Sequence, residues 1–208
     1  MVLENNVDGY SLQMAIKLFI ANIIETQFYV TLDADVVLLR RFAYQDLIIS
    51  NVNSESGLLM KRGIYENEGR EVHLNWWVHS CKLLKSSSFG CKEASGSDGF
   101  GVTPAVLSVW GSVTVLDRLK SIYGENKIEE KLLEKFNENI WTEYTLYALT
   151  LYDYGVFDML HIEHDVEDRK IIHCNDVWYH HQLPWNAQVF DGNFFDFTVL
   201  FFLLYDPV

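Results

Sequence analysis

The spacing of hydrophobic side chains predicts a helix followed by a buried strand near the N-terminus. Apolar residues recur three and four positions apart from about Ser11 to Ile24, which is the period of an amphipathic helix. The run from Phe28 to Leu32 is continuously apolar or β-branched, which is typical of a strand buried on both faces. Asp33 and Asp35 follow directly, so two carboxylates lie at the carboxyl end of this strand.

Further segments show helical periodicity, strand-like apolar runs or clusters of Ser and Gly. The stretch from Lys85 to Gly101 is rich in Ser and Gly and predicts a loop. Thr103-Pro104 after it is a typical helix start. By these criteria helices are expected at residues 71–85, 103–123, 127–137 and 142–154, and strands at 57–60, 156–162, 170–173 and 198–204. The mixture favours an α/β domain with a mainly parallel sheet flanked by helices, whose ligands bind beyond the carboxyl ends of the strands.

The overall composition indicates one acidic globular domain over residues 1–208. The chain has 16 Lys and Arg against 29 Asp and Glu, a formal net charge of −13, and 49% of its residues are hydrophobic. A phosphate backbone attracts clustered basic residues, so this charge balance argues against nucleic acid as a partner. The same balance is compatible with a protein that holds a divalent cation.

The cysteines and the ends of the chain bear on its location. Cys81, Cys91 and Cys174 are odd in number and lack a CxxC or zinc-finger spacing, which favours reduced thiols over a disulfide framework. The first ten residues lack the basic and apolar regions of a signal peptide. The apolar stretch Phe194–Tyr205 is interrupted by Asp196 and is short for a spanning helix; a buried strand is expected there, with a membrane anchor as the alternative. We therefore expect a cytoplasmic location and no integral membrane span.

Asp33 and Asp35 form a DxD motif whose two side chains can point the same way and converge on one ion. Mg²⁺ and Mn²⁺ prefer oxygen ligands and keep substrate phosphates in their shell, so the pair suits a phosphate-bearing substrate. Two enzyme classes place this motif after an apolar strand. In haloacid-dehalogenase-like phosphatases the first Asp is the nucleophile and the second the acid/base, whereas in GT-A-fold glycosyltransferases the motif binds the metal that carries a nucleotide-sugar diphosphate. A solvated turn at the strand end is the third interpretation.

Four segments in order favour the glycosyltransferases. They are Gly9-Tyr-Ser-Leu-Gln13-Met-Ala-Ile-Lys17-Leu, Tyr29-Val-Thr-Leu-Asp33-Ala-Asp35, Gly101-Val-Thr-Pro104-Ala-Val-Leu-Ser108 and Trp141-Thr-Glu143-Tyr-Thr-Leu-Tyr147. Together they resemble a largely uncharacterised family of DxD-containing, nucleotide-diphospho-sugar transferase-like proteins. The resemblance covers about residues 9–155 and implies a GT-A-like α/β fold. The downstream acidic residues that the phosphatases need match poorly, at Asp165-Val-Glu-Asp168.

The resemblance implies a transferase that moves a sugar from a nucleotide-diphosphate donor to a hydroxyl of a glycan or other acceptor, with Mn²⁺ or Mg²⁺ as cofactor. Asp35 would coordinate the metal, and Asp33 would bind the metal, one of its waters or the donor ribose. A third metal ligand in this fold often comes from a His near the C-terminus. His181 is the candidate here, with His180 and His173 as alternatives.

Several side chains are candidates for contacts with the donor, and the resemblance implies one for the acceptor. Gln13, Lys17 and Trp185 would contact the donor, the lysine as a point charge for the diphosphate. Glu143, in the first turn of a helix, would face the acceptor or act as the general base for its hydroxyl. Asp98 would bind hydroxyls of the donor sugar. Each of these side chains also has a purely structural interpretation, as a solvated helix charge, a turn residue or a carboxylate that complements the helix dipole.

Proteins of the resembled family begin with a strand, a helix and a second strand that hold the nucleotide base, well before the Gln-Lys helix. In this chain that helix starts near residue 11. We therefore expect a single GT-A-like domain over residues 1–208 that is partial, with its N-terminal strands missing. A catalytically degenerate domain that serves in an interaction is the non-enzymatic alternative.

Overall fold

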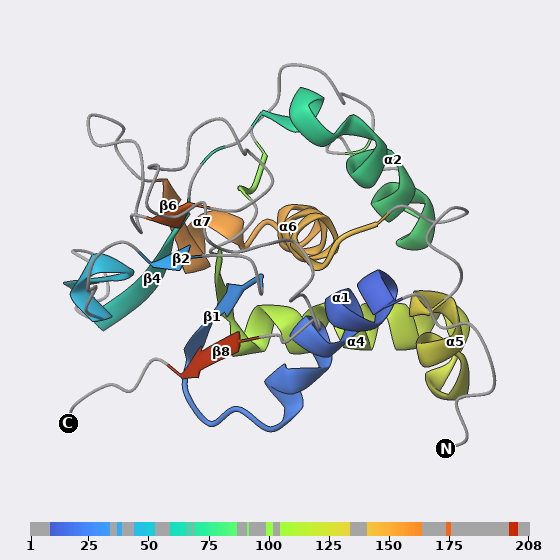
Figure 1. Cartoon of the computed structure of the whole chain (residues 1–208), viewed down its shortest axis with the longest axis horizontal. Helices are drawn as coiled ribbons and strands as arrows, with labels where there is room; N and C mark the ends of the chain where they lie inside the picture. The colour runs from blue at the N-terminus through green and yellow to red at the C-terminus, as the bar shows by residue number, and fades with distance from the viewer. Residues whose placement is uncertain are drawn as a thin grey trace, which may run out of the picture.

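The computed structural model describes residues 9–33, 37–38, 44–52, 59–65, 67, 69–86, 91, 99–101, 105–133, 141–163, 174–175 and 200–203. They form a mixed α/β structure, as expected, in which helices pack against small β-sheets (Figure 1). The helices are α1 Gly9–Phe19, α2 Leu74–Leu83, α4 Val109–Tyr123, α5 Ile128–Leu132, α6 Glu143–Asp153 and α7 Phe157–Leu160, with 3-10 turns at Ile20–Asn22, Tyr44–Asp46, Arg70–His73 and Glu125–Lys127. The strands are β1 Phe28–Leu32, β2 Val37–Leu38, β3 Ile48–Val52, β4 Leu59–Tyr65, β5 Ala105–Ser108, β6 His161–Glu163, β7 Cys174–Asn175 and β8 Leu200–Leu203.

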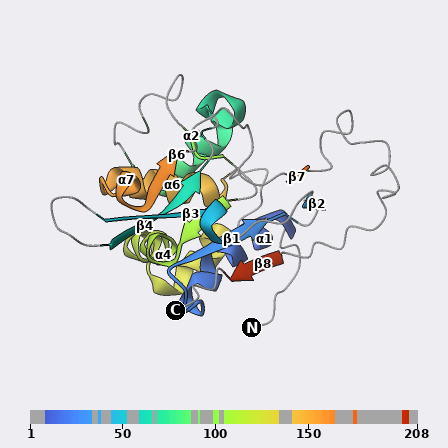
Figure 2. The same ribbon diagram turned by 90° about the vertical axis from the view of Figure 1, so that its left-hand side faces the viewer.

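Strand β1 is the centre of a three-stranded sheet in the order β5-β1-β8 and is antiparallel to both neighbours. Val30 pairs with Val106 of β5 on one side and with Phe202 of β8 on the other. A second sheet has the order β3-β4-β6, with β3 antiparallel and β6 parallel to β4, and β2 pairs with β7 apart from both sheets (Figure 2). The prediction of a mainly parallel sheet is wrong for the described strands, among which only β4 and β6 pair in parallel.

Strand β1 is buried on both faces because two different layers cover it. Tyr29 of β1 and Leu107 of β5 belong to the core that α1, α2, α4 and α6 build. Val30 and Val106 belong to a second core with Ile64 of β4. The β5-β1-β8 sheet therefore lies between a helical layer and the β3-β4-β6 sheet. An antiparallel strand covered on both sides is as apolar as a parallel one, so the sequence pattern could not distinguish the two.

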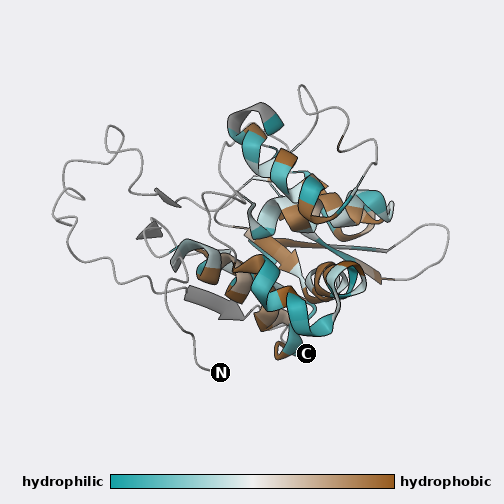
Figure 3. Cartoon of the chain, turned by 90° about the vertical axis from the view of Figure 1, so that its right-hand side faces the viewer, coloured by the Kyte–Doolittle hydropathy of each residue, from teal (hydrophilic) through white to brown (hydrophobic). Residues whose placement is uncertain are grey.

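Helix α6 lies in the interior of the described structure. All residues from Trp141 to Leu151 are buried. Figure 1 shows the helix nearly end-on, between α2 on one side and α1 with α4 on the other. In the ribbons of the outer helices, by contrast, hydrophilic and hydrophobic residues alternate (Figure 3). The first turn of α6 lies close to the face of β1 that the helices cover.

Most predicted elements are present with shifted ends. The predicted helix from Ser11 is confirmed as α1, the predicted strand 28–32 as β1 and the predicted helix from Thr142 as α6. Segment 156–162 is not one strand but the short helix α7 followed by β6, and 170–173 lies outside the described residues. Leu200–Leu203 of the apolar C-terminal stretch forms strand β8. No helix in the described ranges is long and apolar enough to cross a bilayer.

The predicted helix 103–123 is wrong at its start. Ala105–Ser108 is strand β5, and α4 begins only at Val109, with the Ser108 side chain as N-cap accepting a hydrogen bond from Gly111 N. All four residues of β5 are buried beside β1. Pairing and burial in the sheet therefore outweigh the local start signal of Thr103-Pro104.

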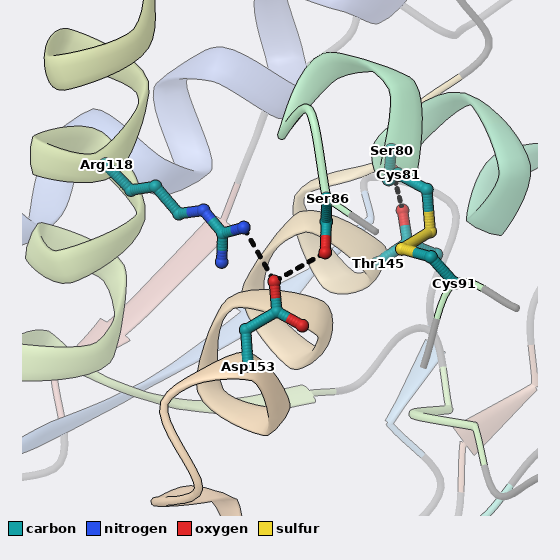
Figure 4. Close-up of a disulfide and its surroundings, with 7 residues drawn as sticks. All are labelled: Ser80, Cys81, Ser86, Cys91, Arg118, Thr145 and Asp153. Atoms are coloured by element: carbon teal, nitrogen blue, oxygen red, sulfur yellow. Dashed lines mark hydrogen bonds and ion pairs between the residues drawn. A yellow bond between two sulfur atoms is a disulfide. The ribbon is translucent and has the colours of Figure 1, made fainter. Parts of the chain in front are cut away.

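A disulfide joins Cys81 of α2 to Cys91, with Cα atoms 5.8 Å apart (Figure 4). The prediction of reduced cysteines is therefore wrong, and cysteine usage no longer argues for a cytoplasmic location. An odd number of cysteines leaves one thiol over but does not prevent the other two from pairing. Figure 4 also shows the contacts of two α6 residues, Thr145 and Asp153. Ser80 Oγ lies 2.5 Å from Thr145 Oγ1, and Asp153 is held by Arg118 at 2.6 Å and Ser86 at 2.7 Å.

Candidate functional site

The ammonium group of Lys17 is the centre of a polar cluster inside the helical layer. Its Nζ lies 2.5 Å from Asp33 Oδ1, 2.6 Å from Glu143 Oε1 and 3.0 Å from the hydroxyl of Tyr144. The Lys17 side chain is fully buried, as is that of Glu143, whereas the Asp33 side chain is 29% exposed. The cluster therefore runs from the interior to the surface, and Asp33 forms its outer end.

Helix α1 and the end of β1 together place Asp33. Gln13 and Lys17 lie four residues apart, so both project from the same face of α1. Gln13 Nε2 donates a hydrogen bond of 2.7 Å to Asp33 Oδ1, the oxygen that Lys17 also contacts. Three of the predicted site residues thus meet at one carboxylate oxygen.

The capped start of α6 places Glu143. Thr142 is the N-cap, and its side chain accepts a hydrogen bond from Thr145 N while the Thr145 hydroxyl accepts one from Thr142 N, which is a capping box. Glu143 is the first residue of the helix, where the helix dipole favours a negative charge. Among the described residues, neither carboxylate oxygen of Glu143 has a hydrogen-bond partner, and Oε1 forms the ion pair with the Lys17 ammonium.

Burial and charge act in opposite directions on these groups. Burial raises the pKa of Glu143, and the neighbouring Lys17 ammonium opposes this rise. Burial disfavours the charged form of Lys17, but Glu143, Tyr144 and Asp33 outweigh it and raise the pKa of Lys17 well above its usual value. The lysine is therefore charged. Its positive charge faces the carboxyl groups of both Asp33 and Glu143.

The cluster offers part of a site for a divalent cation. The partly exposed carboxylate of Asp33 is an oxygen ligand of the kind that Mn²⁺ and Mg²⁺ prefer. No group of three His, Cys, Asp or Glu side chains that could hold a metal occurs within the described ranges. The other predicted ligands, Asp35 and His181, lie outside these ranges, as do Asp98 and Trp185 and the alternatives His173 and His180.

Two tyrosines of α6 were not predicted as part of any site. Tyr144 accepts a hydrogen bond from Lys17, and its hydroxyl lies 3.4 Å from Thr31 Oγ1 of β1. Three residues further along α6, the hydroxyl of Tyr147 lies 2.7 Å from Nε2 of His161. Tyr144 could have been identified from the sequence, because it directly follows the predicted base Glu143.

A second polar network lies one turn along α6 and is fully buried. Tyr147 OH is 2.9 Å from Ser108 Oγ and accepts a hydrogen bond from Ser108 N, and His161 Nδ1 is 3.2 Å from the carbonyl oxygen of Gly63. Burial lowers the pKa of His161 to about 3, so the ring is neutral at ordinary pH. The network joins α6 to β4, β5 and β6, and its burial suits a structural role.

Comparison with known proteins identifies the family of the chain. No curated protein matches it, and no solved structure does. A family model described as "Family of unknown function (DUF6492)" matches residues 2–200, nearly the whole length. The chain belongs to this family.

Proposed function

We propose that this chain is a metal-dependent glycosyltransferase with a GT-A-like fold, which moves a sugar from a nucleotide-diphosphate donor to an acceptor hydroxyl. One observation carries the proposal. Glu143 is fully buried, its Oε2 lacks a hydrogen-bond partner among the described residues, and Lys17 ties it to Asp33 of the DxD motif. A buried carboxylate oxygen without a donor costs free energy. Such an atom is expected where a hydroxyl of a ligand supplies the missing hydrogen bond.

The proposed reaction uses Glu143 as the base. The acceptor oxygen bonds to the anomeric carbon of the donor sugar, and the bond from that carbon to the β-phosphate oxygen breaks. The electrons of that bond leave on the nucleoside diphosphate, and the proton of the acceptor hydroxyl passes to the Glu143 carboxylate. Burial raises the pKa of Glu143, which favours uptake of this proton, and the neighbouring Lys17 ammonium opposes that rise.

Asp33, with Asp35 and His181, would hold Mn²⁺ or Mg²⁺, and the ion when bound would neutralise the charge of the leaving diphosphate. Gln13 orients the Asp33 carboxylate by its hydrogen bond to Oδ1. Asp98 and Trp185 remain proposed contacts of the donor.

Calorimetry with Mn²⁺ and a panel of nucleotide sugars tests the function. At least one nucleotide sugar should bind only when Mn²⁺ is present, and Asp35→Asn should abolish that binding. Asp117→Asn is the matched control, because Asp117 is an exposed helix residue in a surface ion pair with Lys120. Binding that survives Asp35→Asn, or no binding of any nucleotide, would refute the proposal.

A phosphatase assay separates the alternative enzyme. If the chain releases phosphate from an aryl phosphate and loses this activity in Asp33→Asn, the haloacid-dehalogenase-like interpretation holds instead. A chain that neither binds nucleotides nor cleaves the aryl phosphate would fit the degenerate interaction domain.

A further inference from the structure

Three oxygens surround the ammonium group of Lys17, two as hydrogen-bond acceptors and the third, on Glu143, as an ion-pair partner. A lysine ammonium carries three N–H groups. Asp33 Oδ1, Glu143 Oε1 and Tyr144 OH lie 2.5, 2.6 and 3.0 Å from Nζ, and all three belong to the protein. A ligand phosphate would have to displace one of these oxygens to reach the ammonium.

The main chain of Lys17 is held as firmly as its side chain. Tyr29 OH donates a hydrogen bond of 2.8 Å to the carbonyl oxygen of Lys17 and lies 2.8 Å from Ser112 Oγ of α4. Both hydroxyls are buried. Lys17 is therefore held at two points, at its carbonyl oxygen and at Nζ.

The three oxygens around Nζ belong to residues outside α1. Asp33 ends β1, and Glu143 and Tyr144 form the first turn of α6. When both are ionised, the carboxylates of Glu143 and Asp33 would repel each other without a cation between them. The ammonium group of Lys17 is this cation, and its Nζ forms an ion pair with each carboxylate.

We infer that Lys17 is a positioning residue that fixes the proposed base Glu143 relative to Asp33 of the DxD motif, rather than a ligand of the donor diphosphate. This inference rests on the proposed function, and it gives Lys17 a role different from the one expected from the sequence. It also makes Asp33 and Glu143 a coupled pair.

Four proteins test the inference: wild type, Lys17→Met, Glu143→Gln and the double variant, with Lys120→Met as a surface control. The readouts are the Kd of UDP and of GDP at saturating Mn²⁺, and the kcat for release of nucleoside diphosphate from the nucleotide sugar that wild type binds. Lys17→Met should lower kcat about 100-fold, as expected for a displaced catalytic group, with less than a threefold change in the Kd of the nucleoside diphosphate. In the Glu143→Gln background the same change should lower kcat at least tenfold less, because the base is already absent.

Two results would overturn the inference. A rise of tenfold or more in the Kd of the nucleoside diphosphate would show that Lys17 binds the diphosphate. Effects of Lys17→Met and Glu143→Gln that simply multiply would show that the two residues act separately.

Thermal unfolding of the same proteins needs no ligand and keeps the two proposals apart. Lys17→Met leaves buried carboxylate without its cation, so it should lower Tm more than the double variant does. If the double variant is no more stable than Lys17→Met, the proposed link is absent. If wild type binds no nucleoside diphosphate, the glycosyltransferase proposal fails and the role of Lys17 in transfer fails with it, while the Tm comparison still decides whether Lys17 couples the two carboxylates. If Lys17→Met does not fold but the double variant does, this rescue supports the coupling between Lys17 and Glu143.

Discussion

Tyr144 accepts a hydrogen bond of 3.0 Å from the Lys17 ammonium and also places its ring 4.9 Å from that ammonium. The same residue therefore offers the lysine a hydroxyl and an aromatic face. Since Tyr144 is buried, both contacts form in surroundings with little water, where they are stronger than at a surface. The tyrosine completes the set of acceptors that keeps a charged lysine inside the protein.

Tyr144→Phe separates the two contacts, because it removes the hydroxyl and keeps the ring. We expect the free energy of unfolding to fall by about 1.5–3 kcal/mol, the usual contribution of a hydrogen bond to a charged group. Urea denaturation measures the change. Tyr154→Phe, at a half-exposed ring, should cost less than about 0.5 kcal/mol. An equal effect of the two substitutions would contradict the arrangement around Lys17.

Gly111→Ala should destabilise the protein through a steric clash with α6. A Cβ at Gly111 would lie 2.6 Å from Tyr147 Cε2 and 2.7 Å from Ser108 Oγ, both of which are buried. We expect a loss of about 1–3 kcal/mol, as for other overpacked cores. Gly9→Ala is the matched control in another helix, because no heavy atom lies within 4 Å of its added Cβ. If both changes are neutral in denaturation, α4 and α6 do not approach as closely as described.

Loss of the Cys81–Cys91 disulfide should lower stability without unfolding the protein. The bond closes a loop with a sequence separation of 10, for which loop entropy predicts about 2–3 kcal/mol. Cys81→Ser/Cys91→Ser and reduced wild type should therefore show the same fall in Tm. Thiol titration in denaturant provides the check on pairing: the chain has three cysteines, so one free thiol is expected before reduction and three after it. Three free thiols without reductant would contradict the disulfide.

His161 should make the protein sensitive to acid. Its pKa is about 3 in the folded state because of burial, and about 6.5 in the unfolded chain. Between these values the unfolded state binds a proton that the folded state does not. Stability is therefore full above pH 6.5 and falls as the pH drops toward 3, by up to about 1.4 kcal/mol per pH unit.

His161→Gln should remove this part of the slope. Denaturation of wild type and variant at several pH values gives the difference in unfolding free energy between them. That difference should stay constant above pH 7 and shrink steadily between pH 6 and 4. A difference that is independent of pH would mean that the histidine is not buried in its neutral form.

The sequence predicted those parts of the site that depend on local spacing. Gln13 and Lys17 lie in the helix predicted from Ser11, and Glu143 was predicted in the first turn of the helix 142–154; both helices are present. Asp33 was placed at the end of a buried strand, and that strand is β1. That these four residues meet was only an implication of the resemblance, since nothing in local periodicity brings α1 and α6 together.

Other features depend on contacts between distant segments, and the sequence predicted them poorly. An apolar run reports burial but not strand direction, so β1 was expected in a parallel sheet and is antiparallel to β5 and β8. Thr103-Pro104 signalled a helix, but the following residues pair with β1. The partner of Cys81 could not be derived from spacing, and the contact of Tyr144 with Lys17 joins positions 127 residues apart.

The complete burial of Trp141 to Leu151 has a consequence for how this protein can vary. An ordinary surface helix has an outward stripe on which substitutions accumulate without effect, and α6 has no such stripe. Because these side chains are all buried, we expect the neighbouring layers to have to accommodate a change of volume at any of these positions. Sequence drift in this segment should therefore be slow on every face of the helix, and changes that do occur should come in compensating pairs with α1, α2 or α4.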